Sequence, residues 1–153
     1  MELIQLAADG LVPSLDRMPG LVLGEMTEIH VALGNSRPQW ISEDRRFGFF
    51  RTDAEPPVNE TSWPRFRLNA QQAAVRVGFP PKVANQFAGA LGEMHSNIFE
   101  HSEAPDTGIL AFRATPGVFE FVVSDRGIGV LKSLKSCPER ALLNDHGDAC
   151  SLR

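Results

Sequence analysis

One long amphipathic segment, from about Lys82 to Ser102, constrains the fold of this chain most strongly. Its apolar residues recur three or four positions apart, which is the period of an α-helix that packs one face against a core. Pro81 precedes the segment, and proline suits the first turn of a helix. We therefore expect a long helix here, with an apolar stripe made by Phe87, Leu91, Met94 and Ile98.

A row of polar residues lies on the neighbouring face of the same segment. Glu93, Asn97 and His101 are each four positions apart, so a helix brings them onto one side. A carboxylate and an amide one turn apart can hold a hard cation through oxygen, or position a water on it, which is how Mg²⁺ is usually held beside phosphates. We expect one face of this helix to pack and the other to bind a ligand.

A β-hairpin and a glycine-containing loop follow. The apolar runs 109–114 and 118–124 are joined by Thr115-Pro116-Gly117, which predicts two antiparallel strands. The second run leads directly into Asp125-Arg126-Gly127-Ile128-Gly129. Gly127 and Gly129 permit close backbone approach to a ligand, and Asp125 could accept a hydrogen bond from an exocyclic amino group.

The remaining segments are less informative. Asn69 to Val77 is expected to be helical, and Gly78-Phe79-Pro80-Pro81 should end it. Further expected elements are short strands at 29–33 and 47–50, a linker or irregular crossing at 53–60, and a last helix at 138–145.

Composition excludes several classes of protein. The chain has 153 residues, 42% of them hydrophobic, which suits one main domain with a packed core. A net charge of −4 without basic runs argues against nucleic acid and anionic membranes as partners. No apolar run reaches membrane-spanning length and no signal peptide is evident, so a cytoplasmic protein is expected. Cys137, His146 and Cys150 lack the close spacing of zinc ligands, and two reduced thiols are favoured over a metal site.

Two of these features together resemble a known superfamily. The segment 93–101 is similar to the N box, and 125–129 to the first glycine box, of the histidine-kinase-like ATPases. This superfamily joins sensor histidine kinases, anti-sigma-factor serine kinases, type II topoisomerases, mismatch-repair proteins and heat-shock chaperones. The order of the two motifs, their separation and the hairpin between them all match, over roughly residues 66–136.

The resemblance implies a role for each matching residue. Asn97 would be the Mg²⁺ ligand, Glu93 the residue that activates water or the accepting hydroxyl, and Asp125 the reader of the adenine amino group. Gly127 and Gly129 would let the loop pass close to the nucleotide, and His101 would lie near the phosphates. ATP and Mg²⁺ are therefore the expected ligands, and a regulatory protein is an expected partner in signal transduction.

The chain departs from the superfamily in one respect. The second glycine-rich box, which forms the phosphate-facing end of the ATP lid, is absent, since Gly147 is the only glycine after Gly129. We accordingly divide the chain into an N-terminal segment of unknown role, residues 1–62, and an ATP-binding domain, residues 63–153, that is C-terminally incomplete.

The sequence supports two functions on one fold. We expect an α/β two-layer sandwich with a mixed, mostly antiparallel sheet and helices on one face. The leading function is Mg-dependent ATP binding in an ATPase or protein kinase. The alternative is a non-catalytic regulatory or protein-interaction module with a degenerate nucleotide pocket.

Overall fold

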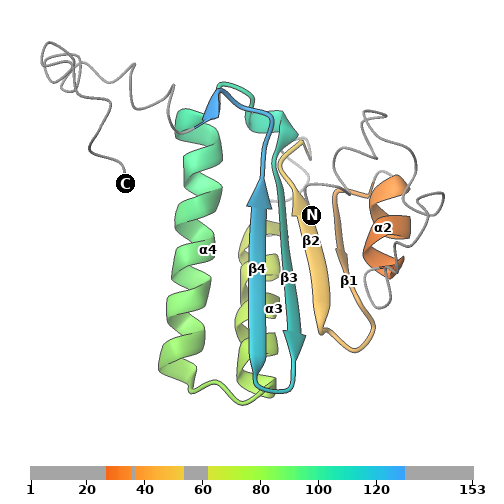
Figure 1. Ribbon diagram of the computed structural model, residues 1–153, viewed down its shortest axis with the longest axis vertical. Helices are drawn as coiled ribbons and strands as arrows, with labels where there is room; N and C mark the ends of the chain where they lie inside the picture. Colours follow the sequence, from red (N-terminus) through yellow and green to blue (C-terminus); the bar gives the residue numbers. More distant parts are fainter. Residues whose placement is uncertain (1–26, 36, 54–61, 130–153) are drawn as a thin grey trace, which may run out of the picture.

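The computed structural model describes residues 27–35, 37–53 and 62–129. Within these ranges the chain forms three α-helices, one short 3₁₀ helix and four strands (Figure 1). In chain order they are α2 (Thr27–Gly34), β1 (Gln39–Ile41), β2 (Phe47–Arg51), α3 (Ser62–Arg76), α4 (Pro81–His101), η3 (Pro105–Thr107), β3 (Ile109–Thr115) and β4 (Val118–Ser124).

The four strands form one antiparallel sheet in the order β1-β2-β3-β4. In the centre of the sheet Ala111 of β3 lies opposite Phe49 of β2 on one side and Val122 of β4 on the other. Strands β1 and β2 belong to the N-terminal segment, residues 1–62, and β3 and β4 follow it. The two parts therefore share one sheet, and the expected crossing at 53–60 lies mostly outside the described residues.

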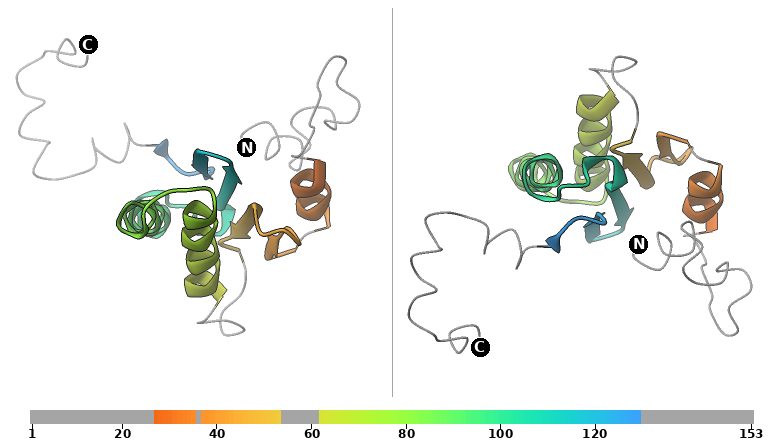
Figure 2. Two further views of the ribbon diagram at one scale, coloured as in Figure 1. Left: turned by 90° about the horizontal axis from the view of Figure 1, so that it is seen from below. Right: turned by 90° about the horizontal axis from the view of Figure 1, so that it is seen from above.

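The two faces of the sheet are covered by different helices (Figure 2). Successive residues of a strand point to opposite faces. Phe50 thus joins the core under α3 and α4, together with Phe66, Leu91 and Ile98, whereas Phe49 packs on the other face, where α2 contributes Ile29. The predicted α/β sandwich is confirmed by α3, α4 and the sheet, and α2 adds cover on the second face.

The long helix and the hairpin are confirmed nearly to the residue. Helix α4 buries Ala84, Ala88, Leu91 and Ile98. Met94 is different: it was expected in the apolar stripe but is 45% exposed. The strands β3 and β4 are joined through Gly117, whose φ of 74° is a backbone conformation that glycine adopts without strain.

Two expectations for the other segments need correction. Residues 29–33 were expected to be a strand, but they belong to α2 because Ile29, Ala32 and Leu33 have helical spacing and are all buried. The helix expected at 69–77 begins earlier, at Ser62, since Pro64 falls in its first turn, where a missing N–H is tolerated. The helix expected at 138–145 lies outside the described residues.

Candidate functional site

The polar row of α4 is exposed along its whole length: Glu93, Asn97 and His101 all lie on the surface. Each residue of an α-helix advances by about 100°, so residues four apart drift by about 40° around the axis. Relative to buried Ile98, His101 is turned by about 60° and Glu93 by about 140° in the same sense. Glu93 therefore points farthest from the core, and His101 lies closest to the packed face.

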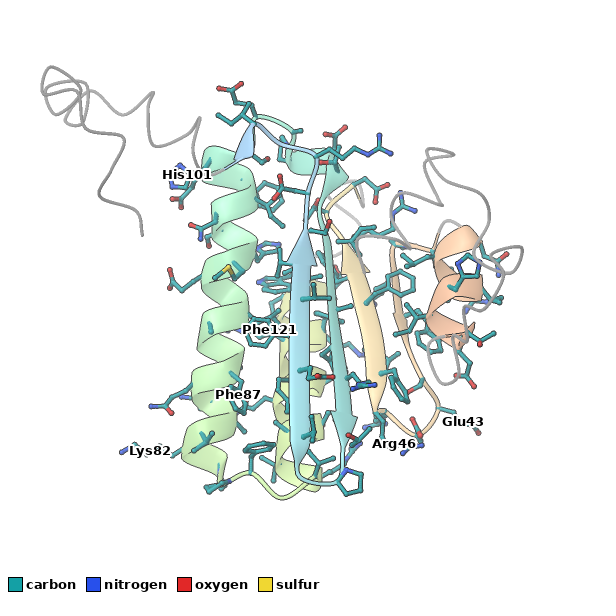
Figure 3. All side chains as sticks on the ribbon, viewed as in Figure 1. Glu43, Arg46, Lys82, Phe87, His101 and Phe121 are labelled. Atoms are coloured by element: carbon teal, nitrogen blue, oxygen red, sulfur yellow. The ribbon has the colours of Figure 1, made fainter. Side chains whose placement is uncertain are left out.

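The row lies on the flank of α4 that faces away from α3. His95 is turned from Ile98 in the opposite sense to His101, and it stacks on Trp63 of α3. Phe87, by contrast, stacks on Phe119 of β4, with ring centroids 5.2 Å apart. Figure 3 shows Phe87 and Phe121 between α4 and β4, and His101 at the C-terminal end of the helix.

The loop after β4 docks on that C-terminal end. The backbone N–H of Ile128 donates to the carbonyl oxygen of Ser102 at 2.9 Å. Ser102 itself is only 5% exposed. A Cβ on Gly127 would overlap both the carbonyl oxygen and the Cβ of Ser102, so glycine at this position is required by the packing of the loop against the helix end. The structure thus brings the glycine loop against the residue that follows His101.

Asp125, which directly follows β4, is exposed. Its Oδ1 accepts a hydrogen bond from the backbone N–H of Gly127 at 2.7 Å, which folds the loop into a tight Asp-initiated turn. Gly129 has a φ of 73°, so its backbone also favours glycine. The described residues show no hydrogen bond between Asp125 and either Glu93 or Asn97.

Two residues that the sequence did not single out hold this loop. The Thr107 hydroxyl accepts a hydrogen bond from the backbone N–H of Arg126 at 2.9 Å, and the Ser102 carbonyl oxygen accepts one from the backbone N–H of Ile128. Both lie in the segment that joins α4 to β3. A serine directly after a long helix and a threonine after Pro105-Asp106 are the only local signs of these roles.

His95 lies within the segment 93–101 but faces α3. It is half-buried, and its pKa is lowered from the ordinary value of 6.5, first by burial and then by the positive charge of Arg67. Its imidazole ring contacts the rings of Trp63, Phe50 and Phe99. His95 is therefore a packing residue between α3 and α4.

No cluster of three or more histidine, cysteine, aspartate or glutamate residues that could hold a metal ion occurs in the described part of the chain. Any Mg²⁺ at Asn97 would need oxygen ligands from the nucleotide and water, which is the usual arrangement for this ion. Three surface hollows lie away from the polar row. Two of them, of about 570 and 340 Å³, lie beside α2, and the third, of about 390 Å³, lies between Ile29 of α2 and the strands β3 and β4.

Comparison of the chain with models of protein families, with curated proteins and with solved structures finds no match. Among the described helices, none combines the length and the apolar character needed to cross a membrane.

Proposed function

We propose that this chain binds ATP together with Mg²⁺, in the manner of the histidine-kinase-like ATPases. The observation that supports the proposal is the docking of the glycine loop on the end of the helix that carries the polar row. Residues 125–129 and the His101 end of α4 are joined by the hydrogen bond from Ile128 to Ser102. The loop thus contacts the residue that follows the segment 93–101, although the hairpin separates the loop from that segment in the sequence.

In this proposal each group has a separate task. The Asn97 amide oxygen binds the cation, the Asp125 carboxylate reads the adenine amino group, and His101 contacts the phosphates. Gly127 and Gly129 shape the loop beside the nucleotide, and Glu93 is the base that activates the attacking group in a kinase or ATPase. We place the protein in the cytoplasm, in signal transduction with a regulatory protein partner.

The second candidate is a non-catalytic regulatory or interaction module. The direction of Glu93 favours it, since a general base must reach the proton that it abstracts and Glu93 points away from the core. A nucleotide could then be bound without being hydrolysed.

The test is calorimetric titration of the chain with ATP, in Mg²⁺ and in EDTA, for three proteins: the unsubstituted chain, Asn97→Ala and Asn85→Ala. Asn85 is also exposed on α4 but about 120° further around the helix, so it controls for the substitution itself. We expect Asn97→Ala to weaken binding in Mg²⁺ by about tenfold or more, with little change in EDTA, and Asn85→Ala to change neither. Absence of ATP binding by the unsubstituted chain would exclude the proposed function.

A further inference from the structure

Three consecutive backbone N–H groups of the loop after β4 are each bound by a different acceptor. Arg126 donates to the Thr107 hydroxyl at 2.9 Å, Gly127 to the Asp125 carboxylate at 2.7 Å, and Ile128 to the Ser102 carbonyl at 2.9 Å. Two of these acceptors lie outside the loop, in the segment between α4 and β3. The shape of the loop is therefore fixed from that neighbouring segment.

The Thr107 hydroxyl is itself held in place. It donates to the carbonyl oxygen of Ala104 at 2.7 Å, which leaves its lone pairs to accept from Arg126. The Ala104 N–H in turn donates to the Ser102 hydroxyl at 3.0 Å. The Thr107 hydroxyl is thus connected through Ala104 to Ser102 at the end of α4, and the loop is connected to α4 through Thr107.

The same segment is tied to the sheet. The Thr52 hydroxyl accepts from the N–H of Gly108 at 2.8 Å, and the Gly108 carbonyl accepts from the N–H of Thr52 at 2.9 Å. Thr107 therefore sits between two anchored neighbours, the end of α4 and the end of β2. A hydroxyl held in this way can fix the position of a loop whose backbone N–H donates to it.

We infer that Thr107 is a positioning residue for base recognition: by holding the Arg126 N–H, its hydroxyl sets the direction in which the neighbouring Asp125 carboxylate meets a nucleotide base. The inference rests on the proposed function, because it takes Asp125 as the group that reads adenine. Thr107 does not need to touch the nucleotide, since it acts through the backbone of Arg126.

The experiment compares Thr107→Val, which removes the hydroxyl and keeps the shape, with Thr107→Ser, which keeps the hydroxyl. Thr115→Val, at a half-buried threonine of β3, controls for the loss of a hydroxyl elsewhere. Amide hydrogen exchange at Arg126 and Ile128 is measured without nucleotide, and ATP and GTP affinities are measured by titration. Thr107→Ala provides a second variant without the hydroxyl should Thr107→Val fail to fold.

We expect Thr107→Val to speed exchange at Arg126 and to lower the affinity for ATP by about tenfold, reducing the preference for ATP over GTP. Thr107→Ser and Thr115→Val should match the unsubstituted chain. Unchanged exchange at Arg126, or faster exchange with unchanged ATP affinity and selectivity, would overturn the inference. Failure of the proposed function is seen separately, as no ATP binding by the unsubstituted chain, and the exchange data then still decide whether Thr107 holds the loop.

Discussion

The imidazole of His95 lies flat on the indole of Trp63, with ring centroids 3.9 Å apart and ring planes inclined by only 8°. This stack joins the middle of α4 to the first turn of α3. Trp63 also contacts Phe50 and Phe66, so the imidazole is part of an aromatic cluster at this end of the core. A side chain that can be protonated, the His95 imidazole, is thus part of the packing between α4 and α3.

The first prediction is that the stability of the protein falls in mild acid because of His95. Its pKa is lowered in the folded state, so the unfolded chain binds a proton more readily. The contribution of His95 to the free energy of unfolding is therefore complete above 6.5, the ordinary pKa of histidine. It is lost as the pH falls from there through the lower pKa of the folded state. We expect the melting temperature to drop between pH 7 and pH 5 because of this residue.

Thermal unfolding followed by circular dichroism across this pH range checks the prediction. His95→Phe keeps an aromatic ring on Trp63 but cannot titrate, so it should flatten the pH profile. His101→Gln is the control for the loss of an imidazole on the exposed face of α4. If His95→Phe and the unsubstituted chain lose the same stability between pH 7 and pH 5, His95 is not the source.

The second prediction concerns Gly127. A methyl group there would overlap the Ser102 carbonyl oxygen, which is backbone and cannot be displaced cheaply. Gly127→Ala should therefore push the loop off the end of α4, lower the free energy of unfolding by about 1–3 kcal/mol and reduce ATP affinity. Chemical denaturation and titration with ATP measure the two effects.

Gly89→Ala is the matched control for this substitution. Gly89 is exposed on α4 and a Cβ there would meet nothing within 4 Å. Alanine should instead stabilise the helix by about 0.5–1 kcal/mol. A Gly127→Ala protein as stable as Gly89→Ala would show that the loop does not pack on Ser102 in solution.

Local periodicity was sufficient for the elements that position the site, but not for the contacts within it. The spacing of Leu91 and Ile98 predicts α4, and the two apolar runs around Gly117 predict the hairpin. The run 29–33 is short and apolar, so it is compatible with a strand as well as with the helix that it forms. The contact of Gly127 with Ser102 joins segments on either side of the hairpin, and no local pattern encodes it.

The exposure of Asp125 could not be predicted for the same reason. Its position after an apolar strand does not say what covers the end of the sheet, and Asp125 is exposed in the structure. The direction of Glu93 is a further example. Its four-residue spacing from Asn97 predicts a shared face, but only the packing of Ile98 defines which way that face points.

The third prediction tests base recognition. Asp125→Asn keeps an oxygen that can bind the Gly127 N–H but replaces an acceptor-only carboxylate by an amide that also donates. Binding of ATP should weaken by about tenfold and the preference for ATP over GTP should shrink. Asp106→Asn, at an exposed aspartate of η3, serves as the control in the same titrations. Equal affinity of the unsubstituted chain for ATP and GTP would remove the adenine-reading role from Asp125.

The last prediction separates catalysis from binding and rests on Glu93. A positioned carboxylate that abstracts a proton contributes typically about 10²- to 10⁴-fold to a rate, but only in a site that holds the nucleophile in line and excludes bulk water. Glu93 is exposed and lies about 140° around α4 from buried Ile98. We therefore expect this chain to bind Mg·ATP weakly and to release phosphate barely above background. Glu93→Ala should leave the ATP affinity within about twofold, because a base is not a binding group.

Phosphate release at saturating Mg·ATP, measured beside affinity for the unsubstituted chain, Glu93→Ala and Glu100→Ala, distinguishes the two candidate functions. Glu100 is another exposed glutamate of α4 and controls for the loss of charge. Turnover that Glu93→Ala abolishes and Glu100→Ala preserves would establish the enzyme, against our expectation for this chain. Binding without turnover in all three proteins would favour the regulatory module, since the nucleotide would then act as a ligand and not as a substrate. Turnover that survives Glu93→Ala would show that another group, or water alone, accepts the proton.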